Sequence, residues 1–153
     1  AIDKNFESAF IKCQMASSNP LPLKGSLFVS VKDSDKPKIL PVVRNFQKHG
    51  FKIKATPGTA IYLIDGGVKT EVINKVSQGS PHIVDDLLND KIDILINTTE
   101  GRKSINDSFS LRRTALLKNL PYFLTVSGAR AAINSIKELK NNDLEVNPIT
   151  SFH

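Results

Sequence analysis

The sequence contains no tryptophan, two tyrosines and a single cysteine, Cys13. One cysteine cannot form an internal disulfide, so packing and hydrogen bonds must hold the fold, as is usual in a reducing compartment. No apolar run approaches the ~20 residues that a transmembrane helix requires, and residues 1–7 lack the apolar stretch of a signal peptide. We therefore expect a cytoplasmic protein with no membrane span.

Motifs for common catalytic chemistries are also missing. The sequence has neither a Walker phosphate loop nor a Gly-x-Gly-x-x-Gly fingerprint, and its histidines, acids and cysteine are not spaced as metal ligands. Asp33 and Asp35 are paired carboxylates near a predicted strand end, but they serve equally well as helix caps. His82 follows Pro81 and is more typical of a structural or interface histidine than of a base. We expect no catalytic residue and no metal ligand.

The composition is that of one ordinary globular domain. Of 153 residues, 40% are hydrophobic and 24% are charged, which provides enough apolar material for one core. The net charge is +6, and residues 36–64 contain six lysines and arginines but no acid. Such a stretch attracts anions, although most of these side chains also fit a solvated basic face. Without an RNA-binding aromatic motif or a helix-turn-helix signature, nucleic acid is a poorer candidate partner than a phosphorylated small molecule.

An amphipathic helix is predicted near the start of the chain, because apolar residues recur at helical spacing from Phe6 to Cys13. Residues 18–24 follow it with two prolines among small polar residues, which is typical of a linker. We therefore divide the chain into a helical segment, residues 1–17, the linker, and one domain over residues 25–153.

Five predicted strands alternate with helices after the linker. The strands are short apolar runs at residues 26–31, 51–55, 69–73, 92–96 and 122–126. The helices are expected to begin at capping or first-turn residues: Asp33 to Pro37, Thr59, Ser80-Pro81, Asp107 or Ser108, and Ser127. Pro41, inside the first of these helices, predicts a kink or a later start. Alternating strands and helices form right-handed βαβ units, so we predict an α/β fold with a parallel sheet between two helical layers.

The loop after the second strand, Thr56-Pro57-Gly58-Thr59, suits a phosphate. Ligands in such folds bind beyond the carboxyl ends of the strands. Thr56 and Thr59 offer hydroxyls, Gly58 lets the backbone approach closely, and the helix start offers N–H groups. Pro57 removes one of those donors. A capped helix start without a ligand explains this motif equally well.

The loop after the fourth strand favours the ligand. Residues 97–99 are an asparagine and two threonines, which provide more polar capacity than a turn requires. Gly101 and Arg102 add backbone freedom and positive charge. Lys36 and Lys75 also follow strands and are candidate counter-ions of a phosphate, although either one alone is more typical of a surface lysine.

Together these loops resemble the methylglyoxal-synthase-like domain, and within that superfamily the C-terminal allosteric domain of carbamoyl-phosphate synthetase large chains. The matching stretches run in family order: Ser30-Val31-Lys32-Asp33-Ser34-Asp35-Lys36, Ala55-Thr56-Pro57-Gly58-Thr59-Ala60, Val72-Ile73-Asn74-Lys75-Val76, Gly79-Ser80-Pro81-His82-Ile83, Ile96-Asn97-Thr98-Thr99-Glu100-Gly101, and Asp107-Ser108 with Leu111-Arg112-Arg113. They cover the chain from Gly25 to about Leu139. The helix before the linker also resembles the last helix of the preceding synthetase domain, which implies a fragment of a longer polypeptide.

The resemblance implies a three-layer fold whose five parallel strands lie in the order 3-2-1-4-5, and a regulatory domain without cofactor or chemistry of its own. UMP would inhibit and IMP would activate the parent enzyme, which makes carbamoyl phosphate from glutamine, bicarbonate and ATP with magnesium, for pyrimidine and arginine biosynthesis. The partners would be the rest of the large chain and its glutaminase small subunit. Carried over by position, the phosphate contacts are Lys36, Thr56, Gly58, Thr59, Lys75, Asn97, Thr98 and Thr99, and the residues near the sugar and base are Gly101, Arg102 and Ser108.

Two departures from the family pattern bear on function. Pro57 stands where the family often has another residue, which affects one phosphate donor. The Gly-Gly-Asp segment that carries the catalytic carboxylate of methylglyoxal synthases is absent from residues 78–81. A phosphate lyase of the methylglyoxal-synthase type is therefore the second hypothesis, and a structural module with an empty site is the third.

Overall fold

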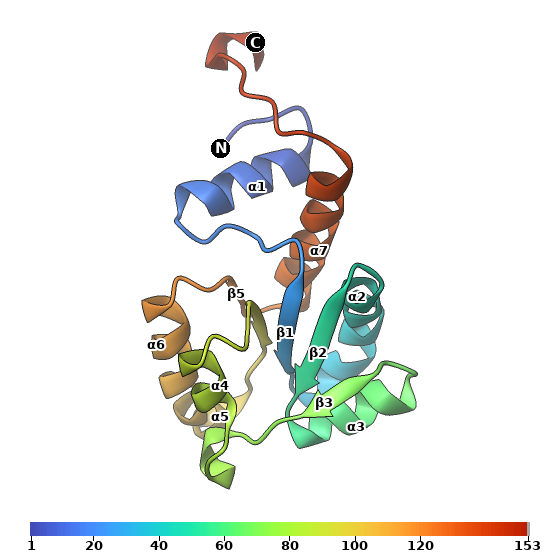
Figure 1. Cartoon of the computed structure of the whole chain (residues 1–153), viewed down its shortest axis with the longest axis vertical. Coiled ribbons are helices and arrows are strands. Elements are labelled where there is room, and N and C mark those ends of the chain that lie inside the picture. The colour runs from blue at the N-terminus through green and yellow to red at the C-terminus, as the bar shows by residue number, and fades with distance from the viewer. Residues whose placement is uncertain (153) are drawn as a thin grey trace.

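The computed structural model describes residues 1–152, apart from the side chain of residue 103. It contains a five-stranded sheet in the order β3-β2-β1-β4-β5, with all neighbouring strands parallel. The strands are β1 (Gly25–Ser30), β2 (Phe51–Ala55), β3 (Thr70–Val72), β4 (Ile94–Asn97) and β5 (Tyr122–Phe123). The helices are α1 (Phe6–Ala16), α2 (Lys36–Lys48), α3 (Pro57–Asp65), α4 (Ile83–Leu88), α5 (Gly101–Asp107), α6 (Phe109–Leu117) and α7 (Val126–Asn141). The predicted α/β class and strand order are confirmed (Figure 1).

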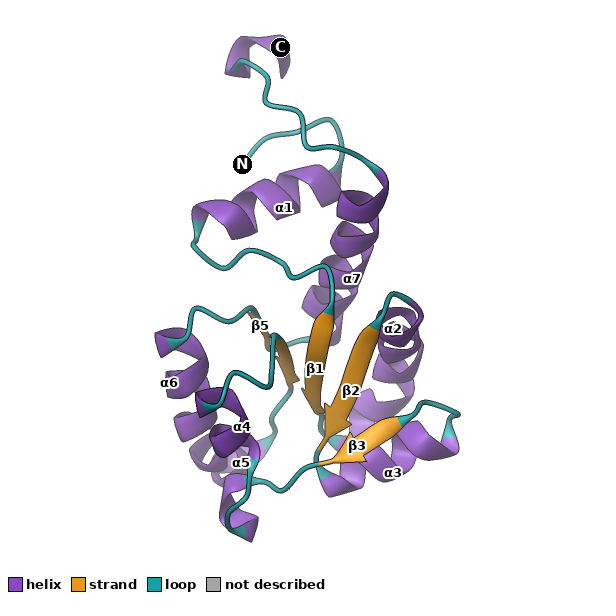
Figure 2. Cartoon of the chain, in the orientation of Figure 1, coloured by secondary structure: helices purple, strands orange, loops and turns teal. Residues whose placement is uncertain are grey.

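Helices cover both faces of the sheet, because successive strand residues point to opposite sides. On β1, Leu27 and Val29 pack into a core with residues of α1, α2, α3 and α7. Phe28 points the other way, into a second core with α4 and α6. Figure 2 shows the strands lying between α2, α3 and α7 on one side and α4 and α6 on the other. None of the described helices has the length and apolar character needed to cross a membrane.

The helix α1 and the residues after it contribute to the larger core. Ile11 and Leu21 are buried there, and the ring of Phe10 lies 6.3 Å from that of Phe123 on β5. α1 lies beside α7, near the amino ends of the strands (Figure 1). Its assignment to a preceding domain stays a prediction.

The start of α4 differs from the prediction. The helix begins at Ile83, with His82 as its N-cap residue, and not at Ser80-Pro81. The Asp85 carboxylate explains the difference, because it accepts hydrogen bonds from the His82 N–H (2.8 Å) and from Ser80 Oγ (2.7 Å). These two bonds hold the pKa of Asp85 below its usual range, so a charged carboxylate stays at the positive end of the helix.

Other element boundaries differ as well. α7 is capped by Thr125, whose Oγ1 accepts a hydrogen bond from the Gly128 N–H (3.0 Å), and not by Ser127. α2 begins at Lys36 and runs through Pro41, so the predicted later start is wrong. The helix α5 is absent from the sequence-based prediction, and β5 is shorter than expected.

A close contact between Gly25 and Asp93 fixes the amino end of β1. Gly25 has φ +129°, and a Cβ there would lie 2.1 Å from Asp93 Oδ2. That oxygen accepts a hydrogen bond from the Ser26 N–H (2.7 Å), and the Asp93 N–H donates to Ser26 O (2.9 Å). These two hydrogen bonds join the amino end of β1 to Asp93, which directly precedes β4. The Asp93 carboxylate leaves no room for a side chain at position 25.

Gly25→Ala is expected to lower the free energy of unfolding by about 2 kcal/mol or more, because it combines backbone strain with a collision at Asp93. Gly67→Ala is the control: Gly67 has φ +82°, but a Cβ there meets nothing within 4 Å. Strain alone predicts a loss of roughly 1 kcal/mol for the control. Urea denaturation compares the two variants, and equal losses would contradict the collision.

Candidate functional site

A cavity of about 520 Å³ opens at the carboxyl ends of β1, β2 and β4. Ser30, Thr56 and Asn97, which lie at those three strand ends, line it together with residues 75–78 and with residues of α5 and α6. Small-molecule sites usually have volumes of about 300–1,000 Å³. The edge of the sheet that was predicted to bind a ligand is therefore hollow and large enough for one.

A pair of hydroxyls joins the ends of β1 and β2 inside this cavity. Thr56 Oγ1 donates a hydrogen bond to Ser30 Oγ over 3.0 Å. Thr56 is the N-cap residue of α3, but its side chain does not cap the helix. The hydroxyl of Thr56 is thus directed to the strand end, and the first N–H groups of α3 are left without it.

Thr59 and Gly58 lie in the first turn of α3 and contribute in different ways. Thr59 is buried and its Oγ1 accepts a hydrogen bond from the Val31 N–H (3.2 Å), so this hydroxyl stabilises the end of β1. A Cβ at Gly58 would lie 3.6 Å from Lys36 Nζ. The ammonium of Lys36 therefore lies close to the N-terminal turn of α3.

The two predicted counter-ions act on the same carboxylate. Lys36 Nζ lies 2.7 Å from Asp33 Oδ1, and the Lys36 side chain is 19% exposed whereas that of Asp33 is 95% exposed. The hydrogen bond and charge of Lys36, with a smaller effect from the charge of Lys75, hold the pKa of Asp33 below its usual range. The ammonium groups of Lys36 and Lys75 are therefore both near the Asp33 carboxylate, and Lys75 is in the cavity lining.

Asn97 is held in place by side chains from two neighbouring elements. Its Nδ2 donates hydrogen bonds to Ser108 Oγ (3.0 Å) and to Tyr122 OH (2.7 Å). Ser108 Oγ in turn donates to Ser104 O (2.8 Å), so Ser108 stands at the start of α6 without capping it. Both amide donors of Asn97 are taken by protein oxygens, which fixes this part of the cavity wall.

Thr98 and Thr99 line a second cavity, of about 370 Å³, together with Lys32 and Arg130. Thr98 Oγ1 accepts a hydrogen bond from the Lys32 N–H (3.0 Å), and Thr99 Oγ1 accepts one from Arg112 Nη2 (3.3 Å). These two threonines are not among the described residues that line the larger cavity. The polar run after β4 is therefore divided between the two cavities.

The larger cavity brings together part of the predicted set. The predicted residues that line it are Thr56, Lys75, Asn97 and Ser108. Gly58 and Thr59 lie in the first turn of α3, directly after Thr56, and Lys36 lies beside that turn. Gly101 and Arg102 open α5 and are exposed, and neither is among the described residues that line this cavity.

Sequence reasoning missed several polar residues of the cavity. These are Ser30, Ser77, Gln78, Glu100, Ser104 and Asp107. Asp107 directly precedes the predicted Ser108 and Glu100 lies between the predicted Thr99 and Gly101, so each had a signal in its position beside a predicted residue. Ser30 had only its place at the end of the apolar run of β1. Glu100 and Asp107 add carboxylates to the cavity, which therefore carries charges of both signs.

The sequence matches the MGS-like domain family over residues 38–124. It is 46% identical over 151 residues to the carbamoyl phosphate synthase large chain of Mesorhizobium japonicum, a match that covers 99% of this chain and 13% of the relative. The large chain of Methanobrevibacter smithii is 47% identical over 145 residues, with 95% and 14% covered. The C-terminal section of the large chain of Methanopyrus kandleri is 42% identical over 153 residues, with 99% and 28% covered. The chain thus spans about 13% of the length of the first of these relatives.

A solved structure supports the fold independently. Methylglyoxal synthase from Elizabethkingia anophelis aligns with a TM-score of 0.60 and 16% identity, over 74% of this chain and 79% of that one. At this identity the likeness concerns the fold alone. The family match covers more than half of the sequence, and the chain therefore belongs to the MGS-like domain family, with large chains of carbamoyl phosphate synthase as its sequence relatives.

Proposed function

We propose that this chain is the regulatory domain of a carbamoyl-phosphate synthase large chain and that it binds a nucleoside monophosphate, UMP or IMP. One observation carries the proposal: a cavity of about 520 Å³ at the strand ends is lined by Lys75 and by two carboxylates, and Lys36 lies beside the first turn of α3, which follows Thr56 of the lining. The two effectors are those that the family resemblance implies. A phosphate with a polar, uncharged body attached fits this distribution of charge.

The phosphate is proposed to bind between α3 and the two lysines. The first backbone hydrogen bond of α3 is donated by the Ala60 N–H, so the N–H groups before it have no helical partner. The helix dipole favours an anion there. Pro57 stands at the first helical position and removes a donor, and the hydroxyl pair of Thr56 and Ser30, with the ammonium groups of Lys36 and Lys75, supplies others. The other predicted phosphate residues, Thr59, Asn97, Thr98 and Thr99, are proposed to shape the site through their hydrogen bonds.

The sugar and base are proposed to lie toward α5 and α6. Asp107 and Glu100 offer carboxylate oxygens, which accept hydrogen bonds from ribose hydroxyls or ring N–H groups. Ser108 and Ser104 add further polar atoms, and Arg102 is close by on α5. A second anionic group in this part of the cavity would be repelled, which favours a monophosphate nucleoside over a ligand charged at both ends.

Regulation is proposed to act by differential binding, with no reaction in this domain. UMP would bind the low-activity state of the parent better, IMP the high-activity state, and each would shift the population accordingly. The parent reaction, which uses glutamine, bicarbonate, ATP and magnesium in the cytoplasm, would take place in the rest of the large chain and its glutaminase subunit. The domain would need no cofactor of its own.

A phosphate lyase of the methylglyoxal-synthase type is the second candidate, and the fold likeness to methylglyoxal synthase is the observation in its favour. Residues 78–81 contain no carboxylate that could act as the base. Incubation with dihydroxyacetone phosphate, followed by a colorimetric assay for methylglyoxal, distinguishes a lyase from a non-catalytic regulatory domain. We expect no turnover above background.

Calorimetric titration of the chain with UMP and IMP tests the proposed function, with uridine, inosine and inorganic phosphate as controls. Nucleotide binding that the nucleosides cannot reproduce is expected, because the phosphate supplies the main charged contact. If no nucleotide or phosphate binds to the folded chain, the third hypothesis, a structural module with an empty site, replaces this one.

Lys75→Met is expected to weaken nucleotide binding by roughly fivefold, because it removes an ammonium from the cavity while keeping most of the apolar stem. Lys52→Met removes the same charge from β2, at an exposed position outside the larger cavity, and is the matched control. Calorimetry at one ionic strength compares both with the unmodified chain. An equal loss in the two variants would mean that net charge matters and Lys75 does not.

Asp33→Asn is expected to strengthen nucleotide binding by about two- to threefold, because it releases Lys36 from a competing carboxylate 2.7 Å away. Asp90→Asn is the control, since Asp90 is also an exposed carboxylate, 2.8 Å from the partly buried Lys118. Competition titrations measure the two affinities. Weaker binding in Asp33→Asn would assign the carboxylate to the ligand and not to the lysine.

A further inference from the structure

Lys54 differs from the other basic residues of the 36–64 stretch because it is buried. It is 9% exposed, whereas Lys38, Arg44 and Lys48 are exposed. Lys54 lies on β2, and its partner in the ladder with β1 is Phe28, which packs in the core beneath α4 and α6. Its ammonium therefore lies on the same side of the sheet as α4, whereas Lys38, Arg44 and Lys48 belong to α2, which packs on the other side.

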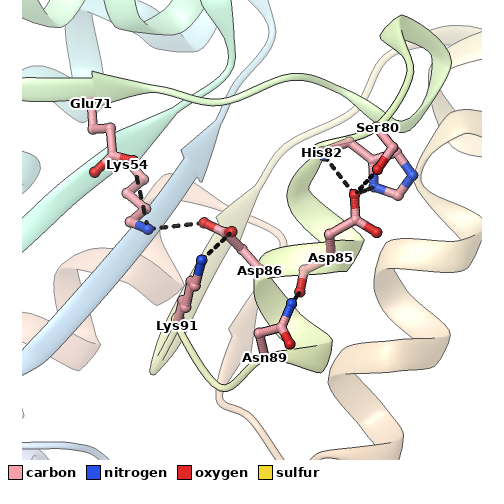
Figure 3. A network of polar contacts seen from close by, with 8 residues as sticks. All are labelled: Lys54, Glu71, Ser80, His82, Asp85, Asp86, Asn89 and Lys91. Carbon is pink, nitrogen blue, oxygen red and sulfur yellow. Dashed lines mark hydrogen bonds and ion pairs between the residues drawn. The ribbon is translucent and has the colours of Figure 1, made fainter.

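Two acids from different elements meet this ammonium (Figure 3). Lys54 Nζ lies 2.9 Å from Asp86 Oδ2 on α4 and 3.8 Å from Glu71 Oε1 on β3. The side chains of Lys54 and Asp86 are 11% and 14% exposed, so this pair is largely shielded from water. Lys91 also approaches Asp86, but only to 3.9 Å and from an exposed position.

The segment between the two acids forms one wall of the larger cavity. We call residues 75–82 the wall segment; its first residues, 75–78, line the cavity, as does Ile83 directly after it. The segment is closed at its neck, where the Ile83 N–H donates to Asn74 O over 3.1 Å. Glu71 precedes this neck and Asp86 follows it, so Lys54 contacts the chain on both sides of the wall segment.

Removing the ammonium of Lys54 would leave Asp86 buried without its closest partner. A buried carboxylate that loses its counter-ion is strongly disfavoured, and it must either take up a proton or move toward water. α4 is short and is held to the sheet by Ile83 and Leu87. A displacement of α4 that exposes Asp86 would also shift Ile83 and the wall segment.

We propose that Lys54 is a positioning residue of the effector site. It touches no ligand; by pairing with Glu71 before the wall segment and with Asp86 after it, it holds that segment in its binding position before the effector arrives. The proposal rests on the proposed nucleotide binding for its effect on affinity. The physical basis is preorganisation, because a wall that is already in place costs less to order on binding.

The test combines two measurements on the 153-residue chain. Lys54→Met is expected to weaken the binding of UMP and IMP by roughly tenfold, as measured by calorimetry. In the ligand-free protein it is expected to speed amide hydrogen exchange in residues 75–83 while exchange in β1 and β4 is unchanged. Lys54→Arg, which keeps the charge and the hydrogen bond to Asp86, is expected to restore most of both properties.

Lys12→Met is the matched control. Lys12 Nζ lies 2.6 Å from Asp3 Oδ2, with side chains 20% and 9% exposed, so this pair is buried to a similar extent, but Lys12 is on α1. It is expected to leave nucleotide affinity and exchange in the wall segment unchanged. Should Lys54→Met fail to fold, Asp86→Asn keeps the side-chain shape, and an intermediate loss of about threefold is expected.

Three outcomes overturn the proposal. They are an unchanged nucleotide affinity in folded Lys54→Met, an equal loss of affinity in Lys12→Met, and amide exchange in residues 75–83 that is as slow in Lys54→Met as in the unmodified chain. The two ideas fail separately. If the unmodified chain binds neither UMP, IMP nor inorganic phosphate, the proposed function is wrong. The exchange measurement on the ligand-free variants then still decides whether Lys54 holds the wall segment.

Discussion

The parallel pairing of β1 with both β2 and β4 determines where a ligand can bind in this domain. From β1 the chain continues to β2 on one side, and after β3 it returns to β4 on the other. The connections that leave β1 and β4 run in opposite directions, so the space beyond these strand ends is not filled by a loop. The cavity, its hydroxyl pair and the nearby N-terminus of α3 all depend on this reversal of strand order.

The strands and most helices could be predicted because their signals are local. Apolar runs separated by glycine, proline and capping residues mark β1, β2 and β4 in the sequence itself. The errors arose where two local solutions compete. Ser80 and His82 both precede α4, and the hydrogen bond from the His82 N–H to Asp85 makes His82 the N-cap residue. Thr125 and Ser127 are both suitable cap residues; because β5 ends at Phe123, Thr125 lies outside the strand and caps α7. α5 lacks an apolar stripe, so periodicity could not reveal it.

The candidate site could be located from the sequence but not assembled from it. Asn97, Thr98 and Thr99 are consecutive, and consecutive side chains at a strand end point in different directions. This alternation separates Asn97, in the larger cavity, from Thr98, in the smaller one; Thr99 lies beyond the end of β4, where alternation no longer applies, and it also lines the smaller cavity. Ser30, Gln78 and Lys54 carry no motif of their own, because their importance comes from contacts with residues far away in the sequence.

In the proposed function, phosphate binding exchanges one anion for another. In the ligand-free protein Lys36 is already paired with Asp33, which carries a single negative charge. A phosphate monoester carries a charge of about −1.5 to −2 at pH 7 and has three acceptor oxygens, so it replaces the carboxylate at a net gain. A carboxylate ligand or a phosphodiester offers no more charge than Asp33 and gains little from the exchange. In that proposal, Asp33 would give the site a preference for terminal phosphates, at the expense of absolute affinity.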